Sequence, residues 1–222
     1  MTEPITEQDF ELLSKCLLFK GMTYDEKSGI LAMLNARKCS FPKGSLVQRL
    51  GEPFCYAGVV ADGVLAGSFI TEKYDNIELG RFQQGDTYGV TTAMKQLKRS
   101  PIQFAAATDV VVIRFDPRLP VSYDNNEVSA KYHNNMVQML IEQNMFLRKR
   151  VIVMGQGSIR NRLLCYLAEL STDKDNYVHV PLSRVELAGF LGVNRSALSR
   201  EITHMVSDGI LETRGSRFRI VR

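Results

Sequence analysis

The segment 191–200, with the sequence LGVNRSALSR, brings arginine and hydroxyl side chains together at a spacing suited to binding a polyanion. Arg195, Ser196, Ser199 and Arg200 share the outer face of one predicted helix, close to its N-terminus. A guanidinium group can donate two hydrogen bonds to O6 and N7 of guanine, or it can bind a phosphate. These four residues are therefore candidates for contacting the bases and phosphates of duplex DNA.

The surrounding residues have the spacing of a helix-turn-helix unit. Ser183, followed three residues later by Glu186, forms a capping box that predicts the start of a first short helix. Gly192 permits the left-handed backbone of a tight turn, and a second helix begins at Asn194 or Arg195. The first helix contains Val185, Leu187, Ala188 and Leu191. The second helix is expected to face inward with Ala197, Leu198, Ile202 and Met205. A helical hairpin inside an enzyme is the alternative interpretation.

The chain ends in a predicted hairpin, 212–220, which carries three arginines. An amphipathic helix over 158–170 and a short strand over 177–182 complete the pattern of a winged helix. Within the hairpin, Arg214 and Arg217 are the candidate DNA contacts.

The distribution of charge is consistent with a polyanion-binding site in the C-terminal third of the chain. The 222 residues are 45% hydrophobic and 23% charged, with a net charge of +4, which describes a globular chain of one large or two modest domains. Residues 155–222 hold ten Lys and Arg against seven Asp and Glu, so the basic excess lies in the last third. No apolar run approaches the roughly 18 residues that cross a bilayer, and the start MTEPITEQDF does not resemble a secretory signal. We expect a cytoplasmic protein with no membrane partner.

Residue types that bind metals or act as nucleophiles are poorly placed for such chemistry. The four cysteines, Cys16, Cys39, Cys55 and Cys165, lie far apart and form no CxxC pair, so we expect free or buried thiols. The histidines are His133, His179 and His204, and none precedes residue 120. No Ser-His-Asp order, P-loop or dinucleotide fingerprint is present. We therefore expect no enzyme and no metal site; a cupin-like enzyme with accessory helices is the rival interpretation.

Three kinds of element precede the winged helix. The first 35 residues have the apolar spacing of helices. From Cys39 to Phe115, short β-rich runs alternate with glycine-containing turns, which predicts an antiparallel jelly roll. Residues 126–154 contain no Pro or Gly and form one long predicted helix. Gly155 to Ser158 then breaks that helix and is interpreted as a hinge or an N-cap.

The long helix has apolar residues on more than one face. One stripe has strict 3-4 spacing, as in a coiled-coil seam, and comprises His133, Met136, Leu140, Gln143, Leu147, Arg150 and Met154. A second stripe comprises Tyr132, Met136, Met139 and Phe146. We expect one face to pack on the chain's own jelly roll and the seam to pack on the same helix of a second copy. A core helix packed within one chain is the alternative.

Together these elements resemble the CRP/FNR superfamily of bacterial transcription regulators. The resemblance covers nearly the whole chain and is strongest over LGVNRSALSR, where Arg195 and Arg200 match arginines of the family's recognition segment. It implies an α+β fold, with an effector-sensing β-roll over 1–125, a dimerisation helix over 126–154 and a winged helix-turn-helix over 155–222. The family glutamate that reads a cytosine is Ser196 here, so the operator is expected to differ from the commonest half-site.

The family's cyclic-nucleotide cassette is only half matched. The run Gly85 to Val90 lacks the glutamate that accepts the ribose hydroxyl, since Val90 stands in its place. Loss of that acceptor costs about 1–3 kcal/mol, which disfavours cyclic AMP. Gly89, Arg99, Ser100 and Asn144 are the candidate effector-binding residues. Arg99 and Ser100 as ordinary turn residues, or as contacts for another anion, are the open alternatives.

Other sensing chemistries of the family are also disfavoured. The N-terminal region has only Cys16, so a four-thiolate iron–sulfur cluster is not expected, and a lone His133 is a poor case for a haem ligand. The effector therefore stays unidentified. The resemblance implies a homodimer that binds a palindromic operator in duplex DNA, with RNA polymerase as a candidate further partner. An effector-free DNA-binding protein is the alternative.

Overall fold

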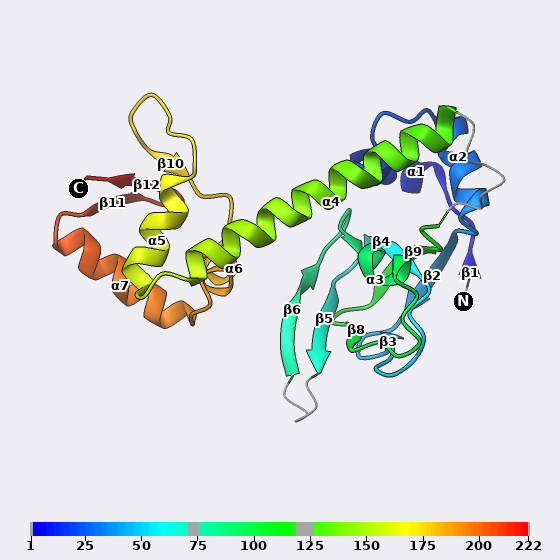
Figure 1. Ribbon diagram of the computed structural model, residues 1–222, viewed down its shortest axis with the longest axis horizontal. Coiled ribbons are helices and arrows are strands. Elements are labelled where there is room, and N and C mark those ends of the chain that lie inside the picture. Colours follow the sequence, from blue (N-terminus) through cyan, green and yellow to red (C-terminus); the bar gives the residue numbers. More distant parts are fainter. Residues whose placement is uncertain (1, 71–75, 119–126, 222) are drawn as a thin grey trace. The chain divides into compact units, whose positions relative to one another are not determined.

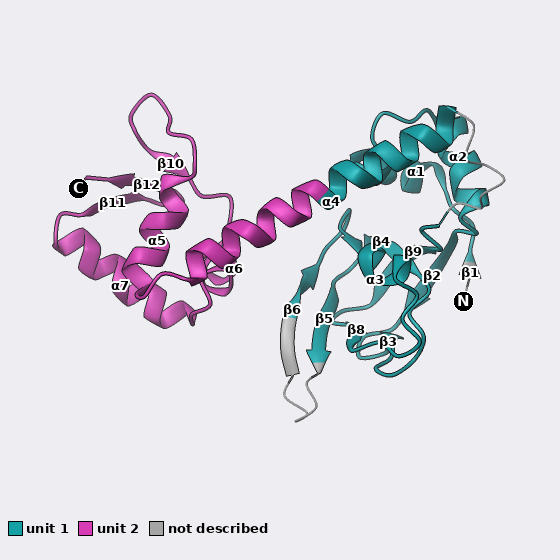
Figure 2. Cartoon of the chain, viewed as in Figure 1, with its two compact units in different colours: residues 1–140 teal, residues 141–222 magenta. Residues whose placement is uncertain are grey.

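The computed structural model describes residues 2–70, 76–118 and 127–221, with the side chains of residues 2, 70 and 76–78 left aside. The chain forms two compact units, residues 1–140 and residues 141–222, whose boundary falls inside one long helix (Figure 2). The expected α+β fold class is confirmed, because helices flank antiparallel sheets in both units (Figure 1).

The first unit opens with the helices expected from the apolar spacing of the N-terminal residues. These are α1 (Glu7–Lys15), the 3-10 turn η1 (Leu17–Phe19) and α2 (Tyr24–Met33). A capping box begins α2: the Thr23 hydroxyl accepts a hydrogen bond from the Glu26 amide at 3.2 Å, and Glu26 Oε2 accepts one from the Thr23 amide at 2.7 Å.

The strands of the first unit form the predicted jelly roll, which we call the β-roll. Its members are β1 (Thr2–Glu3), β2 (Arg37–Phe41), β3 (Leu46–Gln48), β4 (Ala57–Asp62), β5 (Leu65–Ile70), β6 (Asn76–Phe82), β7 (Thr87–Tyr88), β8 (Ile102–Ala106) and β9 (Val110–Phe115), with the short helix α3 (Val90–Met94) between β7 and β8. Two antiparallel sheets result, with strand orders β1-β2-β9-β4-β7 and β3-β8-β5-β6.

Aromatic side chains from both sheets meet inside the β-roll. The ring of Phe104 lies 5.0 Å from that of Tyr88, 5.6 Å from that of Phe82 and 6.0 Å from that of Phe54, centroid to centroid. Two glycines make room for these rings. A Cβ atom at Gly58 would lie 2.6 Å from the Tyr88 ring, and one at Gly67 would lie 2.8 Å from the Phe104 ring. Aromatic rings thus occupy the space between the sheets.

The long helix α4 (Glu127–Met154) has 28 residues and a length of about 42 Å. Its predicted first residue, 126, lies outside the described residues. In the first unit, Tyr132, Met136 and Met139 are buried in the core of the β-roll. The Tyr132 hydroxyl donates a hydrogen bond to the carbonyl of Pro117 at 2.9 Å. The expected packing of one face of α4 on the chain's own roll is therefore confirmed.

Two residues of the predicted seam, Met136 and Arg150, are engaged within their own chain. Met136 belongs to both predicted stripes, and its side chain is buried within its own chain, so it cannot face a partner. Another predicted seam residue, Arg150, donates a hydrogen bond to the carbonyl of Gly189 at 3.2 Å. The apolar residues of α4 that remain exposed are Val137, Ile141, Met145, Phe146, Leu147, Val151, Ile152 and Met154.

The second unit is a winged helix. It contains α5 (Ile159–Ala168), β10 (Val178–His179), α6 (Arg184–Phe190), α7 (Arg195–Ser207), β11 (Leu211–Arg214) and β12 (Arg217–Ile220). The three strands form one antiparallel sheet in the order β10-β12-β11. Leu163, Leu187, Leu198, Met205 and Phe218 belong to its buried core.

Candidate nucleic-acid interface

The second helix of the helix-turn-helix, α7, begins where the sequence predicted. Asn194 is its N-cap, and its Oδ1 accepts a hydrogen bond from the amide of Ala197 at 2.7 Å. Gly192 in the preceding turn has φ of +66°, the left-handed conformation that glycine adopts without strain. The helix buries Leu198, Ile202 and Met205 in the core, and this packing determines which face remains outside.

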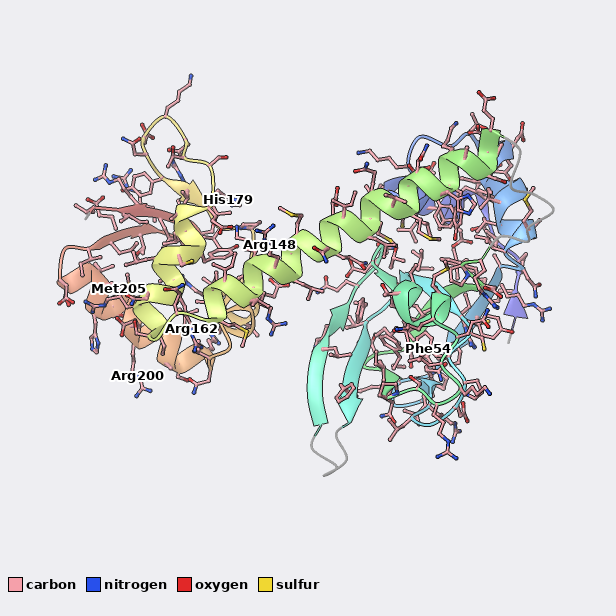
Figure 3. The ribbon with its side chains drawn as sticks, viewed as in Figure 1. Phe54, Arg148, Arg162, His179, Arg200 and Met205 are labelled. Atoms are coloured by element: carbon pink, nitrogen blue, oxygen red, sulfur yellow. The ribbon has the colours of Figure 1, made fainter. Side chains whose placement is uncertain are left out.

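All four predicted contact residues of α7 are exposed. Arg195 and Ser196 occupy its first turn, and Ser199 and Arg200 follow on the next. In Figure 3, Arg200 extends outward from the helix, whereas Met205 belongs to the buried side. Among the described residues, neither Arg195 nor Arg200 forms an ion pair. Their guanidinium groups are therefore available to an external anion.

A different arginine fixes α7 to the domain. Arg160 on α5 pairs through Nε with Glu201 at 2.7 Å and through a terminal nitrogen with Asp208 at 2.8 Å. These two acids lie on and just after α7, so the pairs hold the helix from its inner side while its outer arginines stay free. The hydrogen bonds from the two carboxylates raise the pKa of Arg160 further above its ordinary value.

The two predicted wing contacts differ from each other in the structure. Arg214 is exposed, and its guanidinium carbon lies 4.9 Å from the centre of the Tyr177 ring. Arg217 also lies over this ring, but it forms an ion pair with Asp173 and a second one with Asp175 at 3.6 Å. Only Arg214 of the two makes no ion pair within the described part of the chain.

The acidic partners of Arg217 were not predicted from the sequence. The run Asp173-Lys174-Asp175 lies between α5 and β10, more than 40 residues before Arg217. A short acidic run near a short strand is typical of any surface turn. The opposite charges of this loop and of the arginine-rich hairpin are the one signal that could have indicated the pairing.

The end of α4 and the turn after it are attached to the helix-turn-helix. The Phe146 ring lies 5.3 Å from that of Phe190 on α6, and Lys149 pairs with Glu169 at 3.3 Å. Arg162 Nε donates a hydrogen bond to the Gln156 carbonyl at 3.1 Å, within the predicted hinge. The Ser158 hydroxyl accepts one from the amide of Asn161 at 3.1 Å, so its predicted N-cap role is confirmed.

The four predicted effector residues differ in burial and in their contacts. Ser100 is buried, and its hydroxyl donates to the Ile102 carbonyl at 2.7 Å and accepts from the Ile102 amide at 3.0 Å. Arg99 beside it is exposed. Gly89 is the left-handed N-cap of α3, and a Cβ there would lie 2.8 Å from the Phe54 ring. Asn144 is exposed on α4, in the second unit. The Ser100 geometry is that of a structural turn residue.

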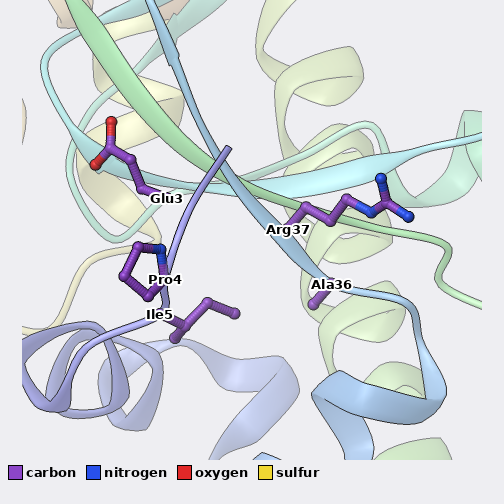
Figure 4. A pocket seen from close by; sticks show the side chains of 5 residues that line it. All are labelled: Glu3, Pro4, Ile5, Ala36 and Arg37. Atoms are coloured by element: carbon purple, nitrogen blue, oxygen red, sulfur yellow. The ribbon is translucent and has the colours of Figure 1, made fainter. Parts of the chain in front are cut away.

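An open pocket of about 440 Å³ lies elsewhere on the first unit (Figure 4). It is lined by Glu3, Pro4, Ile5, Ala36 and Arg37. None of the predicted effector residues belongs to this lining. Within the ranges that the structure describes, no cluster of His, Cys, Asp and Glu could hold a metal ion, and no helix is long and apolar enough to cross a membrane.

A capped second helix with exposed arginines, beside an arginine-bearing hairpin, is the arrangement of the winged helix-turn-helix class of DNA-binding domains. Residues 161–222 match the family model of the Crp-like helix-turn-helix domain. The chain also has the fold of CprK solved in complex with OCPA, at 15% identity and a TM-score of 0.63, covering 89% of this chain and 90% of that one. The c-di-GMP responsive global regulator CLP of Xanthomonas campestris is 16% identical with a TM-score of 0.57, covering 90% of this chain and 100% of that one.

A curated relative extends this likeness. Electron transport regulator A of Shewanella oneidensis is 19% identical over 191 residues, which span 83% of this chain and 75% of the relative. Together these comparisons show a Crp-like helix-turn-helix domain over residues 161–222, in a chain that has the fold of the solved structures named above.

Proposed function

We propose that the chain is a homodimeric, sequence-specific regulator that binds a palindromic operator in duplex DNA through α7. The observation that carries the proposal is the pair of exposed arginines, Arg195 and Arg200, which make no ion pair among the described residues. Because Asn194 caps the helix and the opposite face is buried, the N-terminal end of α7 is rigid and can enter the major groove. Ser196 and Ser199 lie beside the arginines and complete the base-contacting set.

Homodimerisation is supported by the exposed apolar side chains of α4. Val137, Ile141 and Met145 follow one another at helical spacing, and each is about half exposed in the single chain. Exposed apolar surface of this extent on one helix favours burial against a second copy of α4. Two copies would present two α7 helices to half-sites about one helical turn, roughly 34 Å, apart. The dimerisation helix is thus proposed to be 126–154, with its seam on the Val137 side.

We further propose that the β-roll responds to an effector. Two of the structural relatives are described as c-di-GMP responsive and as OCPA-bound, which supports a small-molecule effector for this chain as well. The geometry argues against cyclic AMP held by the usual cassette, because the Ser100 hydroxyl is already engaged by Ile102. The rings around Phe104 occupy the space between the two sheets of the β-roll. This packing favours a second candidate function, an effector-free DNA-binding protein.

Binding-site selection from random duplexes tests the DNA-binding proposal. We expect the purified chain to enrich a palindrome with half-sites about one helical turn apart. Enrichment of no motif would refute sequence-specific binding. A thermal-shift screen of metabolites then separates the two candidate functions, since an effector that binds the folded state raises the melting temperature.

The remaining parts of the proposal concern cellular context. The similarity to transcription regulators favours a regulator over a cupin-like enzyme. Because the proposed target is DNA, we also propose a cytoplasmic location. RNA polymerase is a proposed further partner, which a pull-down on operator DNA with and without the polymerase would test.

A further inference from the structure

The outer face of the wing sheet carries a charge network centred on the buried Tyr177. Three arginines lie around its ring, with guanidinium carbons 4.9–5.1 Å from the ring centre. The Tyr177 hydroxyl donates a hydrogen bond to Glu212 at 2.8 Å, and Glu212 also pairs with Arg219 at 2.6 Å. Arg217 pairs with Asp173 and Asp175. Two of the three arginines therefore already have carboxylate partners.

Asp173 is held in place by its own loop. Its Oδ1 accepts hydrogen bonds from the amides of Asp175 at 2.9 Å and Tyr177 at 3.0 Å, and its Oδ2 accepts from Arg217. Burial alone would raise the pKa of Asp173, but these hydrogen bonds outweigh it and lower the pKa below its ordinary value. The carboxylate is therefore ionised at neutral pH and faces the guanidinium of Arg217 in a fixed position.

We propose that Asp173, assisted by Asp175, limits the sequence-independent affinity of the chain for DNA by withholding Arg217 from the phosphate backbone. Phosphate contacts strengthen binding to every sequence equally, whereas base contacts by α7 distinguish the operator. An arginine neutralised within the chain adds nothing to binding of random sequence. Arg214, which has no ion pair among the described residues, then supplies the phosphate contact of the wing. The inference rests on the proposed function, because it requires that the wing lies beside DNA.

Asp173→Asn is the sharpest test of this role. The amide oxygen of asparagine still accepts the two loop hydrogen bonds, while the negative charge that pairs with Arg217 is lost. Asp175→Asn is added to remove the second pair. As the matched control, Asp62→Asn removes the same charge from an exposed position in the β-roll. Dissociation constants for operator and random duplexes are measured across a series of salt concentrations, and circular dichroism confirms the fold of each variant.

The expected effect is a steeper salt dependence for random DNA. Each added phosphate contact increases the slope of log K against log salt by about 0.9, which amounts to about eightfold in affinity between 1 M and 0.1 M salt. At 0.1 M salt, the Asp173→Asn variant, with or without Asp175→Asn, should therefore bind random duplex about eightfold more tightly per wing than the wild type does. The operator should gain the same factor, so that the ratio of operator to random affinity stays unchanged.

Two alanine variants test the same inference independently. In the wild-type background, Arg214→Ala should reduce the salt slope, whereas Arg217→Ala should leave it unchanged. In the Asp173→Asn background, Arg217→Ala should remove the gain. The inference is overturned if Asp173→Asn behaves like Asp62→Asn, or if Arg217→Ala costs the wild type as much as Arg214→Ala. A wild-type chain that binds operator and random DNA equally would instead refute the proposed function.

Discussion

Replacing Arg200 by alanine should sharply weaken operator binding without disturbing the fold. Its side chain is exposed and forms no ion pair among the described residues, so the substitution removes no internal contact that the structure shows. A bidentate arginine–guanine contact is worth about 1–3 kcal/mol, and a dimer makes it twice. The loss is therefore about 2–6 kcal/mol per dimer, or about 30-fold to 10⁴-fold in affinity at 1.4 kcal/mol per tenfold.

Fluorescence anisotropy with the selected operator at fixed salt measures this loss. Arg49→Ala serves as the control, because it removes one exposed arginine from the β-roll and leaves the net charge the same as in the Arg200 variant. Sedimentation should show the same oligomeric state for both variants. If Arg200→Ala binds operator as tightly as Arg49→Ala does, Arg200 contacts no base and the assignment of α7 as the recognition helix fails.

Three further substitutions test other parts of the structure. Ile141→Glu should convert the dimer to a monomer in sedimentation, because it places charge on the exposed apolar face of α4; an unchanged dimer would locate the interface elsewhere. Asn194→Ala should lower the free energy of unfolding by about 1 kcal/mol through loss of the N-cap, measured by denaturant titration against Asn134→Ala. Tyr88→Phe should be neutral or raise the melting temperature, since the buried Tyr88 hydroxyl has no hydrogen-bond partner among the described residues; a drop of several degrees would reveal one.

The helix-turn-helix could be predicted because its signals are local. The Ser183–Glu186 capping box, the Gly192 turn and the apolar spacing of α7 lie within one 25-residue stretch, and the structure confirms each of them. Burial of one face also determines which residues stay outside. The exposed positions of Arg195, Ser196, Ser199 and Arg200 on α7 could therefore be predicted from periodicity.

Features that depend on distant parts of the chain were not predictable in the same way. On α4 both apolar stripes contained Met136, and only packing against the β-roll shows that this residue faces inward. The pairing of Arg217 joins a loop and a strand that are 44 residues apart in sequence. Ser100 matched a family motif, yet the backbone of Glu52, which accepts from its amide at 2.9 Å, helps to hold it in a turn. Local pattern cannot specify such contacts.

The close fit of glycines to rings in the β-roll limits the order in which this sequence can change during evolution. While Tyr88 and Phe104 keep their rings, a Cβ atom at Gly58 or Gly67 meets them at under 3 Å, so a larger residue there should destabilise the fold. A descendant that acquires a ligand chamber here must truncate a ring first, and only afterwards are the two glycine positions released to evolve new contacts.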